Sequence, residues 1–381
     1  MNVLFVFNKP LNIYAGGVER ITNSIMKGLA IEGIQSFYLE DSGTELFLDG
    51  KPVDVDAFFK EKSIGVVIQQ LAYNGVVARY LLEKEKQIPY VVAWHTAPPT
   101  WIKSWRVATT KSFGIGIGQI KRLLRIVFYP YFYFKELRRF QNRWKWILPR
   151  ISKVLLLSAT FEPEFRRLLG ISTSRLYSIP NLLSFDEIAN PDILGSKKKE
   201  VLIVARMKEQ QKRISLALKI WQLVEKKSVS SNWVLRIVGN GEDLDSYQKL
   251  SRLLNLKRVH FLGSQNPIPF YQTASLFMMT SAFEGWGLTL TESQQFGVVP
   301  VAFDSYASVR DIVEDGKNGL LIPFGNLKVF AEKLSWLMDH SEIRNRMALN
   351  CLKSVCRFEM LNIIPMWKSL LMDVCKRPQS H

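Results

Sequence analysis

The sequence predicts an α/β protein made of two doubly wound domains, and three observations lead to this fold class. Short apolar, strand-like runs alternate with longer helical patterns along most of the chain, which is typical of parallel sheets joined by crossover helices. The chain has 381 residues, more than one hydrophobic core usually serves. A stretch rich in proline, asparagine and lysine, Pro180–Glu200, has the composition of a linker between two halves.

The expected strands form two sets, one in each half. In the first half they are Val3–Phe7, Gln35–Leu39, Ile64–Ile68, Tyr90–Trp94, Lys153–Leu157 and Leu176–Ile179. In the second half they are Val201–Ala205, Trp233–Val238, Val259–Leu262, Leu276–Met279, Val299–Phe303 and Leu320–Ile322. We therefore expect two Rossmann-like domains, over residues 1–180 and 181–362. Neither has the G-x-G-x-x-G dinucleotide fingerprint after its first strand.

Composition limits the class of protein. With 47% hydrophobic and 22% charged residues the chain is typical of globular proteins, and no apolar run approaches the ~18 residues of a membrane span. No signal peptide is visible at the N-terminus. The three cysteines favour neither a disulfide framework nor a zinc site, which fits a reducing, cytoplasmic location.

The net charge of +17 is concentrated in one aromatic block, residues 101–150, which hold 12 Lys/Arg and 1 Asp/Glu. Three interpretations compete for this block: single-stranded nucleic acid binding, a segment lying in a membrane interface, and a helical insertion packed on its own domain. Nucleic acid ranks last, because no recognition fold is visible. For membrane or acceptor contact the candidates are Trp101, Trp105, Lys121, Arg122, Arg125, Arg138, Arg139 and Trp144.

The most informative segment is Phe283–Glu292, which places Glu284 and Glu292 on either side of a glycine-rich turn. The turn follows a buried strand and opens a helix expected over Leu288–Phe296, with Gly297 as its stop. Glycines before a helix leave free N–H groups at the positive end of its dipole, which suits an anion. A ligand with phosphate in the middle and hydroxyls at both ends, such as a nucleotide-sugar, fits this pattern.

The run Phe283–Gly297, followed by Val298–Ala302, resembles the E-x7-E signature of GT4-like retaining glycosyltransferases (glycosyl transferases group 1). That family has the GT-B fold, in which two Rossmann-like domains face a central cleft. The resemblance implies that Glu284 touches the donor sugar and Glu292 the ribose hydroxyls. It also implies that the backbone amides of Gly287, Leu288 and Thr289 meet the phosphate or donor hydroxyls.

Further residues of the second domain match the family's diphosphate loop. Arg206 follows the domain's first strand and Lys212 comes six residues later, which resembles the family's Arg…Lys pair. Arg213 departs from the glycine that many relatives have after the lysine, and the loop is one residue longer than is common. Gly239 begins a turn that forms the lip of the nucleotide pocket in relatives. Cations and amides of this kind can neutralise a leaving diphosphate without a metal.

In the first domain, Gly16 and Gly17 open a helix and resemble the family's glycine loop at the diphosphate. His95 ends a strand, where a doubly wound domain presents side chains to its ligand crevice, and the resemblance places it near the anomeric carbon. The resemblance also implies that the last helix, over residues 363–381, packs back on this domain.

Two Asp-x-Asp repeats, Asp54–Asp56 and Asp243–Asp245, have the pattern of a metal site in other glycosyltransferases. Each precedes a helical pattern, so we expect helix N-caps instead of metal ligands. No metal and no cofactor is expected besides the nucleotide-sugar substrate.

Together these features predict a retaining, metal-independent hexosyltransferase. It would move a hexosyl or N-acetylhexosaminyl unit, from a UDP-sugar in preference to a GDP-sugar, to a lipid-linked, lipopolysaccharide or capsular glycan. The expected partners are the nucleotide-sugar, this acceptor and an anionic membrane surface, and no nucleic acid. The expected location is cytoplasmic and peripheral, on the inner face of the cell membrane. The alternatives are a GT-B nucleotide-sugar epimerase and a non-catalytic sugar-nucleotide or membrane-binding subunit.

Overall fold

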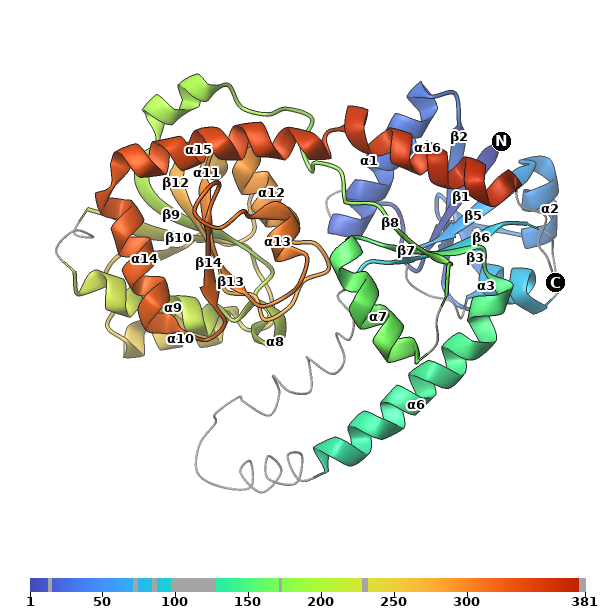
Figure 1. Ribbon diagram of the computed structural model, residues 1–381, viewed down its shortest axis with the longest axis horizontal. Coiled ribbons are helices and arrows are strands. Elements are labelled where there is room, and N and C mark those ends of the chain that lie inside the picture. The colour runs from blue at the N-terminus through green and yellow to red at the C-terminus, as the bar shows by residue number, and fades with distance from the viewer. Residues whose placement is uncertain are drawn as a thin grey trace. The chain divides into compact units, whose positions relative to one another are not determined.

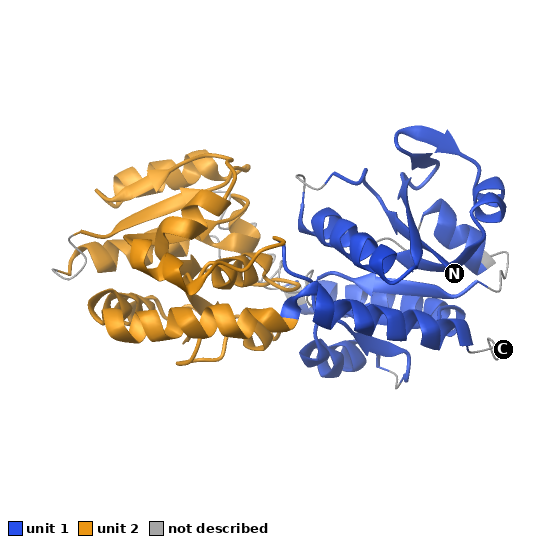
Figure 2. Cartoon of the chain, turned by 90° about the horizontal axis from the view of Figure 1, so that it is seen from above, with its two compact units in different colours: residues 1–99, 115–184, 358–381 blue, residues 100–114, 185–357 orange. Residues whose placement is uncertain are grey.

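The computed structural model describes residues 1–12, 16–70, 75–83, 88–96, 128–170, 173–227 and 232–376, with the elements labelled in Figure 1. They divide into two compact units, coloured separately in Figure 2. Unit 1 holds the described residues up to Ser184 and those from Phe358 onward, and unit 2 holds those of Phe185–Arg357. These boundaries lie a few residues from 180 and 362. The amide of Leu183 donates to the carbonyl of Phe358 at 3.1 Å, so the chain leaves and re-enters unit 1 at neighbouring positions.

Unit 1 is built on a sheet in the order β4-β3-β2-β1-β5-β6-β7-β8. Its strands are β1 (Asn2–Phe7), β2 (Gln35–Asp41), β3 (Leu46–Leu48), β4 (Lys51–Val53), β5 (Ile64–Gln69), β6 (Tyr90–Trp94), β7 (Lys153–Leu156) and β8 (Leu176–Ser178). The six strands from β2 to β8 in this order are parallel, and the antiparallel hairpin β3–β4 extends the edge. The hairpin is a departure from the expected strands. Asp49 and Gly50, both with positive φ, form its two-residue turn.

The helices of unit 1 include one from the far end of the chain. They are α1 (Gly17–Ile31), α2 (Val55–Glu61), α3 (Val76–Glu83), α6 (Tyr129–Ile147), α7 (Glu162–Leu169) and α16 (Met360–Lys376), with 3₁₀ turns η1 (Leu148–Arg150) and η2 (Ala159–Phe161). Helix α16 packs beside α1 and against β5 (Figure 1). Trp367 of α16 contacts Phe5 of β1, and Lys368 pairs with Glu32 at 2.6 Å. The C-terminal helix is thus part of the core of unit 1.

Unit 2 has a fully parallel sheet in the order β11-β10-β9-β12-β13-β14. Its strands are β9 (Lys198–Val204), β10 (Val234–Val238), β11 (Val259–Phe261), β12 (Ala274–Met279), β13 (Val299–Asp304) and β14 (Leu320–Pro323). This is the 3-2-1-4-5-6 order of the Rossmann fold, and its direction reverses between β9 and β12. These two strands pair with Leu276 beside Val201. All twelve strands expected from the sequence are present in the two sheets.

Helices cover both faces of this second sheet. They are α8 (Glu209–Lys212), α9 (Ile214–Glu225), α10 (Leu244–Leu253), α11 (Ile268–Thr273), α12 (Leu288–Gln295), α13 (Val309–Ile312), α14 (Leu327–Asp339) and α15 (Ser341–Val355), with 3₁₀ turns η3 (Pro191–Ser196) and η5 (Cys356–Phe358). Helices α9, α10 and α14 pack together on one face, whereas α11, α12 and α15 lie on the other (Figure 1). Helix α12 ends at Gln295, and Gly297 has the left-handed φ of +63° expected of a helix stop.

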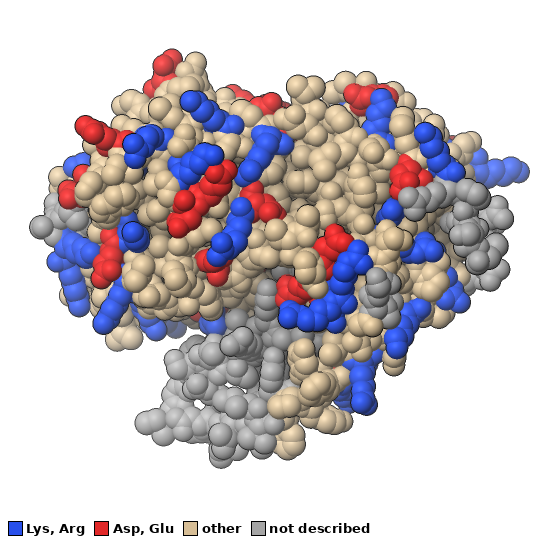
Figure 3. Space-filling model, in the orientation of Figure 1, with Lys and Arg blue, Asp and Glu red and all other residues tan. Residues whose placement is uncertain are grey.

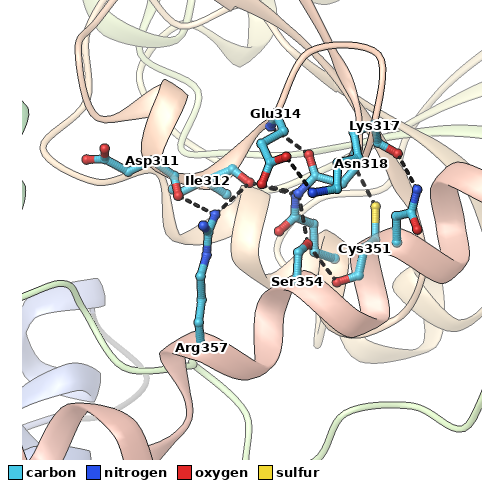
Figure 4. A network of polar contacts seen from close by, with 10 residues as sticks. Asp311, Ile312, Glu314, Lys317, Asn318, Cys351, Ser354 and Arg357 are labelled. Atoms are coloured by element: carbon cyan, nitrogen blue, oxygen red, sulfur yellow. Dashed lines mark hydrogen bonds and ion pairs between the residues drawn. The ribbon is translucent and has the colours of Figure 1, made fainter.

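A polar network fastens the loop before β14 to α15 (Figure 4). The buried Asn318 donates to the carbonyl of Ile312 at 3.1 Å and to the hydroxyl of Ser354 at 2.8 Å, and it accepts from the amide of Glu314 at 2.7 Å. The thiol of Cys351 donates to the carbonyl of Asn318 at 3.0 Å. This network explains the burial of Cys351 without any ligand. The three cysteines are free thiols. Among the described helices, none is long and apolar enough to cross a membrane.

Candidate active site

A small pocket lies at the carboxyl ends of β9 and β12, where the strand order of unit 2 reverses. Doubly wound sheets bind their ligands at this point, because the loops after the two strands diverge there. The pocket is lined by Val204 and Ala205 at the end of β9, by Met279 at the end of β12, and by Lys212 and Thr289. Two residues predicted from the sequence, Lys212 and Thr289, thus meet at the topological switch point.

Glu284 is buried close to this pocket, with 7% of its surface exposed. Its Oε1 accepts a charge-assisted hydrogen bond from Lys212 Nζ at 2.6 Å, and its Oε2 accepts from Gln211 Nε2 at 2.9 Å. A buried carboxylate is stable only with such partners, since an unpaired one loses its hydration without compensation. Glu284 and Lys212 are 72 residues apart in sequence, and the fold brings them together.

Backbone contacts join the loops that carry Lys212 and Glu284. The amide of Ala282 donates to the carbonyl of Gln211 at 2.7 Å, and Thr280 Oγ1 donates to the carbonyl of Lys212 at 3.0 Å. These contacts hold the end of α8 against the Glu284 loop.

Two aspartates expected at helix starts differ in what they cap. Asp243 holds the start of the short helix α8, because it accepts from the amide of Glu209 at 2.7 Å. Asp243 occupies the N-cap position of α10, but its side chain makes no capping hydrogen bond there, so the expectation that it caps this helix is wrong. Asp54 does cap α2, by accepting from Ala57 at 2.9 Å, as predicted.

Helix α12 starts at the same edge of the sheet. Its N-cap, Gly287, has a φ of +98°, and a Cβ there would come 2.7 Å from the hydroxyl of Tyr306. Only glycine fits this position, because both the left-handed backbone and the nearby phenol exclude a side chain. The helix start directs the first amides, those of Leu288 and Thr289, away from the helix at the positive end of its dipole. This arrangement favours an anion.

Glu292 lies one turn further along α12 and is 4% exposed. The hydroxyl of Tyr271 donates to its Oε2 at 2.9 Å, and the ring of Tyr271 stacks on Phe296 with 5.9 Å between centroids. The carboxylate thus has a fixed partner inside unit 2. A ribose contact for Glu292 stays a prediction.

The two other predicted residues of unit 2 differ in their surroundings. Arg206 is exposed in the loop after β9. Gly239, with a φ of +136°, is required by packing, since a Cβ there would come 1.9 Å from the carbonyl oxygen of Ala205. This close approach accounts for Gly239 through the backbone alone, and a direct nucleotide contact stays a prediction.

In unit 1, His95 follows β6 and hydrogen-bonds to the side chain of Gln70, which directly follows β5. Gln70 Nε2 in turn donates to Thr22 Oγ1 on α1 at 3.0 Å. Burial lowers the pKa of His95 to about 4, because desolvation disfavours the imidazolium. The imidazole is therefore neutral at physiological pH, and it is a hydrogen-bonding group rather than a strong base.

Gly17 begins α1 and Gly16 is its N-cap, as the sequence predicts. The backbone of Gly16 is extended, and a Cβ there would come 2.5 Å from Oε2 of the buried Glu19. Glu19 thus places a carboxylate at the positive end of α1, where a diphosphate was predicted. A ligand contact by Gly16 and Gly17 stays a prediction.

Within the basic aromatic block, the structure describes residues 128–150, and Trp101, Trp105, Lys121, Arg122 and Arg125 lie outside the described residues. Arg138 and Arg139 are exposed on α6, as a surface role requires. Trp144 is completely buried, where its ring contacts Trp94, Phe140 and Phe165. The prediction that Trp144 meets a membrane or an acceptor is therefore wrong, because this face of α6 packs into the core of unit 1.

Several residues near these sites were missed in the sequence. Gln211 was noticed only as part of a long loop, and Tyr306 and Tyr271 carried no local pattern. Gln70 could have been found, since it is a polar residue at the carboxyl end of a buried strand in a doubly wound domain. Among the described residues, no cluster of three His, Cys, Asp or Glu side chains could hold a metal ion.

Residues 184–353 match the family model of glycosyl transferases group 1. An uncharacterized glycosyltransferase of Haemophilus influenzae is 30% identical over 193 residues, or 48% of this chain and 54% of that protein. A lipopolysaccharide 1,6-galactosyltransferase of Salmonella typhimurium is 30% identical over 174 residues, or 44% of this chain and 47% of that protein. The chain spans roughly half the length of the curated relatives it matches.

Solved structures resemble the whole chain at low identity. The pneumococcal O-GlcNAc transferase GtfA, in complex with UDP and GlcNAc, has a TM-score of 0.71 at 13% identity, covering 99% of both chains. The lipopolysaccharide outer core galactosyltransferase WaaB has a TM-score of 0.60 at 17% identity, covering 98% of this chain and 99% of that one. These likenesses show the GT-B fold. The match to glycosyl transferases group 1 over residues 184–353 thus covers nearly all of the described part of unit 2.

Proposed function

We propose that the chain is a retaining glycosyltransferase. It transfers a hexosyl or N-acetylhexosaminyl unit from a nucleotide-sugar, with UDP favoured over GDP, to a growing lipid-linked, lipopolysaccharide or capsular glycan. One observation carries the proposal: at the switch point of unit 2, the buried Glu284 is paired with Lys212 at 2.6 Å, beside the N-terminus of α12. A carboxylate for sugar hydroxyls and positive groups for phosphate thus occur in one place.

The leaving diphosphate gains negative charge as the glycosidic bond breaks, so groups that stabilise this charge accelerate the reaction. The amides at the start of α12 and the side chains of Lys212 and Arg206 are fit to do so. Lys212 is fixed by Glu284 before any ligand arrives, which lowers the cost of organising the site. In this proposal the protein's own cations and amides take the place of a metal ion.

We assign the acceptor to unit 1. With a pKa of about 4, His95 is a poor proton acceptor at neutral pH, so we propose that it donates or accepts a hydrogen bond with a substrate hydroxyl. The proton of the attacking hydroxyl would then go to the leaving phosphate oxygen. The sugar would transfer with retention of its anomeric configuration by attack on the same face.

The relatives support the choice of substrates. The structures of GtfA and of Anabaena HepE contain UDP, with GlcNAc and glucose respectively. Among the sequence relatives, a Campylobacter jejuni enzyme is named for a diNAcBac-PP-undecaprenol acceptor, and a Staphylococcus aureus enzyme for poly(ribitol-phosphate). We propose an acceptor of this kind for the present chain.

Helix α6 supports a peripheral position on the anionic inner face of the membrane. Large aromatic side chains are exposed toward its N-terminal end, with Phe128 at 50%, Tyr131 at 60% and Phe134 at 59%. Exposed cations follow along the helix, namely Lys135, Arg138, Arg139, Arg143 and Lys145. Figure 3 shows Lys and Arg side chains along α6, at the lower right, whereas both signs mix over much of the remaining surface. Aromatic groups with flanking cations suit the interface of an anionic bilayer.

A panel of UDP-, GDP- and ADP-sugars, each with and without EDTA, tests the donor and the metal independence together. A ligand at 100 times its Kd stabilises the native state by about 2.7 kcal/mol, which a thermal shift detects. We expect an EDTA-insensitive shift with UDP-sugars, transfer to a lipid-linked glycan, and an α-linked product from an α-linked donor by NMR. A product with inverted configuration would refute retention.

The same panel separates the two alternatives. An epimerase would convert the nucleotide-sugar to its epimer without any acceptor. A non-catalytic subunit would bind the nucleotide-sugar, or the membrane, and leave the sugar on its nucleotide under all conditions.

A further inference from the structure

We infer that Gln211 is a positioning residue, which holds the Glu284 carboxylate in place during transfer. The inference rests on the proposed transferase function and deepens it. Gln211 touches Glu284 through its side chain, with Nε2 2.9 Å from Oε2, and the same Nε2 lies 3.3 Å from the carbonyl of Phe283. The side-chain amide of Gln211 therefore hydrogen-bonds both to the carboxylate of Glu284 and to the backbone carbonyl of the residue before it.

The backbone of Gln211 adds a second anchor. Its carbonyl accepts from the amide of Ala282 at 2.7 Å, so the residue contacts the Glu284 loop from both its main chain and its side chain. The backbone contact keeps Gln211 next to this loop, so its side chain stays within hydrogen-bond distance of Glu284. Gln211 thus fixes the distance between α8 and the segment Ala282–Glu284.

The two partners of Glu284, Lys212 and Gln211, differ in how they would interact with a diphosphate. Lys212 lines the pocket and would face the charge of an arriving diphosphate, which competes with Glu284 for the ammonium. Gln211 is neutral and has less attraction for phosphate. When the ammonium of Lys212 is shared with the diphosphate, the amide of Gln211 is the contact that keeps the carboxylate oriented toward the sugar.

The variant Gln211→Glu gives a signature that general loss of packing would not give. It places a second carboxylate against Oε2 of Glu284, on the side away from the Oε1 that Lys212 holds, and repulsion between the two anions favours a shared proton to higher pH than in an isolated glutamate. At low pH the shared proton replaces the amide hydrogen bond, whereas at high pH the two anions repel. The folded variant binds a proton that its unfolded chain releases near pH 4.3, so its stability relative to wild type should fall as pH rises.

The first experiment measures thermal unfolding from about pH 5 to about pH 8, a range above the ordinary glutamate titration. The difference in Tm between wild type and Gln211→Glu should widen with pH, and adding Glu284→Gln should remove the widening. The control Gln265→Glu alters an exposed glutamine that donates to the carbonyl of Leu262, and its Tm difference should not depend on pH in this way. A pH-independent difference for Gln211→Glu would overturn the contact.

The second experiment measures transfer. Gln211→Met keeps the length of the side chain and removes the donor, and loss of a hydrogen bond to a charged group should lower kcat about tenfold to a hundredfold. The KM for the donor should change less, because Lys212 and α12 remain.

In Gln211→Glu, activity relative to wild type should recover toward low pH. An effect confined to KM, or a relative activity that is constant with pH, would overturn the positioning role. If wild type transfers no sugar, the proposed function fails, while the unfolding comparison still decides whether Gln211 holds Glu284.

Discussion

Two polar groups at the carboxyl edges of the sheets, one around Glu284 in unit 2 and one around His95 in unit 1, differ in charge. In unit 2 the central group is a buried anion, Glu284, paired with the cation of Lys212. Around His95 in unit 1 the partners are neutral, with the side chains of Gln70 and Thr22 joined in one chain of hydrogen bonds. Exposed cations of unit 1 lie along the surface of α6.

This difference suggests which ligand each edge suits. A buried ion pair is costly to desolvate, and its cation can also pair with a charged ligand. A chain of neutral donors and acceptors suits hydroxyl groups, which need hydrogen bonds and no charge. The comparison therefore supports a diphosphate-sugar in unit 2 and a hydroxyl-bearing substrate in unit 1, and the following predictions test it.

The largest expected effect is the loss of transfer in Glu284→Gln. The change keeps the shape of the side chain and removes the charge that holds Lys212, so transition-state contacts are lost and kcat should fall by about a thousandfold. The assay is transfer from the preferred nucleotide-sugar at saturating acceptor. Glu332→Gln, on the exposed surface of α14, is the matched control and should keep full activity. Unchanged turnover in Glu284→Gln would remove Glu284 from the site.

The second prediction compares the two faces of α6. Trp144 is completely buried among three aromatic rings, so Trp144→Ala should lower the free energy of unfolding by about 3 kcal/mol through lost burial and a cavity. Trp146, two residues later, is 46% exposed, and Trp146→Ala should change stability by less than about 0.5 kcal/mol. Urea unfolding measures both. Equal effects would contradict the division of α6 into a core face and a surface face.

The third prediction concerns the exposed face of α6. Reversing Arg138 and Arg139 to glutamate should weaken binding to phosphatidylserine vesicles by about thirtyfold, since each basic residue contributes about 1 kcal/mol near an anionic surface. Flotation with vesicles at low salt measures the binding. The control reverses Lys249 and Arg252, which are exposed on α10 of unit 2, and it should bind as wild type does. If the two double variants bind equally, the cations of α6 have no special role at the membrane.

The sequence predicted the sheets well because each strand is a separate apolar run bounded by turn residues. The hairpin β3–β4 was missed, although Asp49-Gly50 is a turn signal, since strands of three residues carry too little pattern. The local shape around Gly287 was also predictable, because a glycine before a helix has a local cause.

Contacts between distant segments were not predictable in the same way. Gln211 gains its role from a loop 73 residues away, and nothing in its own neighbours marks it. Trp144 was assigned to the surface because composition alone cannot tell which face of a helix is buried. The rings that bury it, Trp94 and Phe165, come from a strand and a helix far from it in sequence.

The smallest expected effect is the pH dependence that His95 gives to unit 1. Its pKa of about 4 in the folded protein is below the ordinary value of about 6.5, so the unfolded chain binds more protons between these two values. His95 therefore contributes stability above pH 6.5 that is lost as the pH falls toward 4. His95 is partly exposed as a residue, so the loss should be on the order of 1–2 kcal/mol, less than the full shift implies. In urea unfolding between pH 7 and pH 5, His95→Gln should reduce the slope of stability against pH, whereas His340→Gln, at the exposed end of α14, should not. If the slope is the same in wild type and His95→Gln, the imidazole is not held neutral by the fold, and the contrast between the charged pair of Glu284 and Lys212 in unit 2 and the neutral group around His95 in unit 1 is lost.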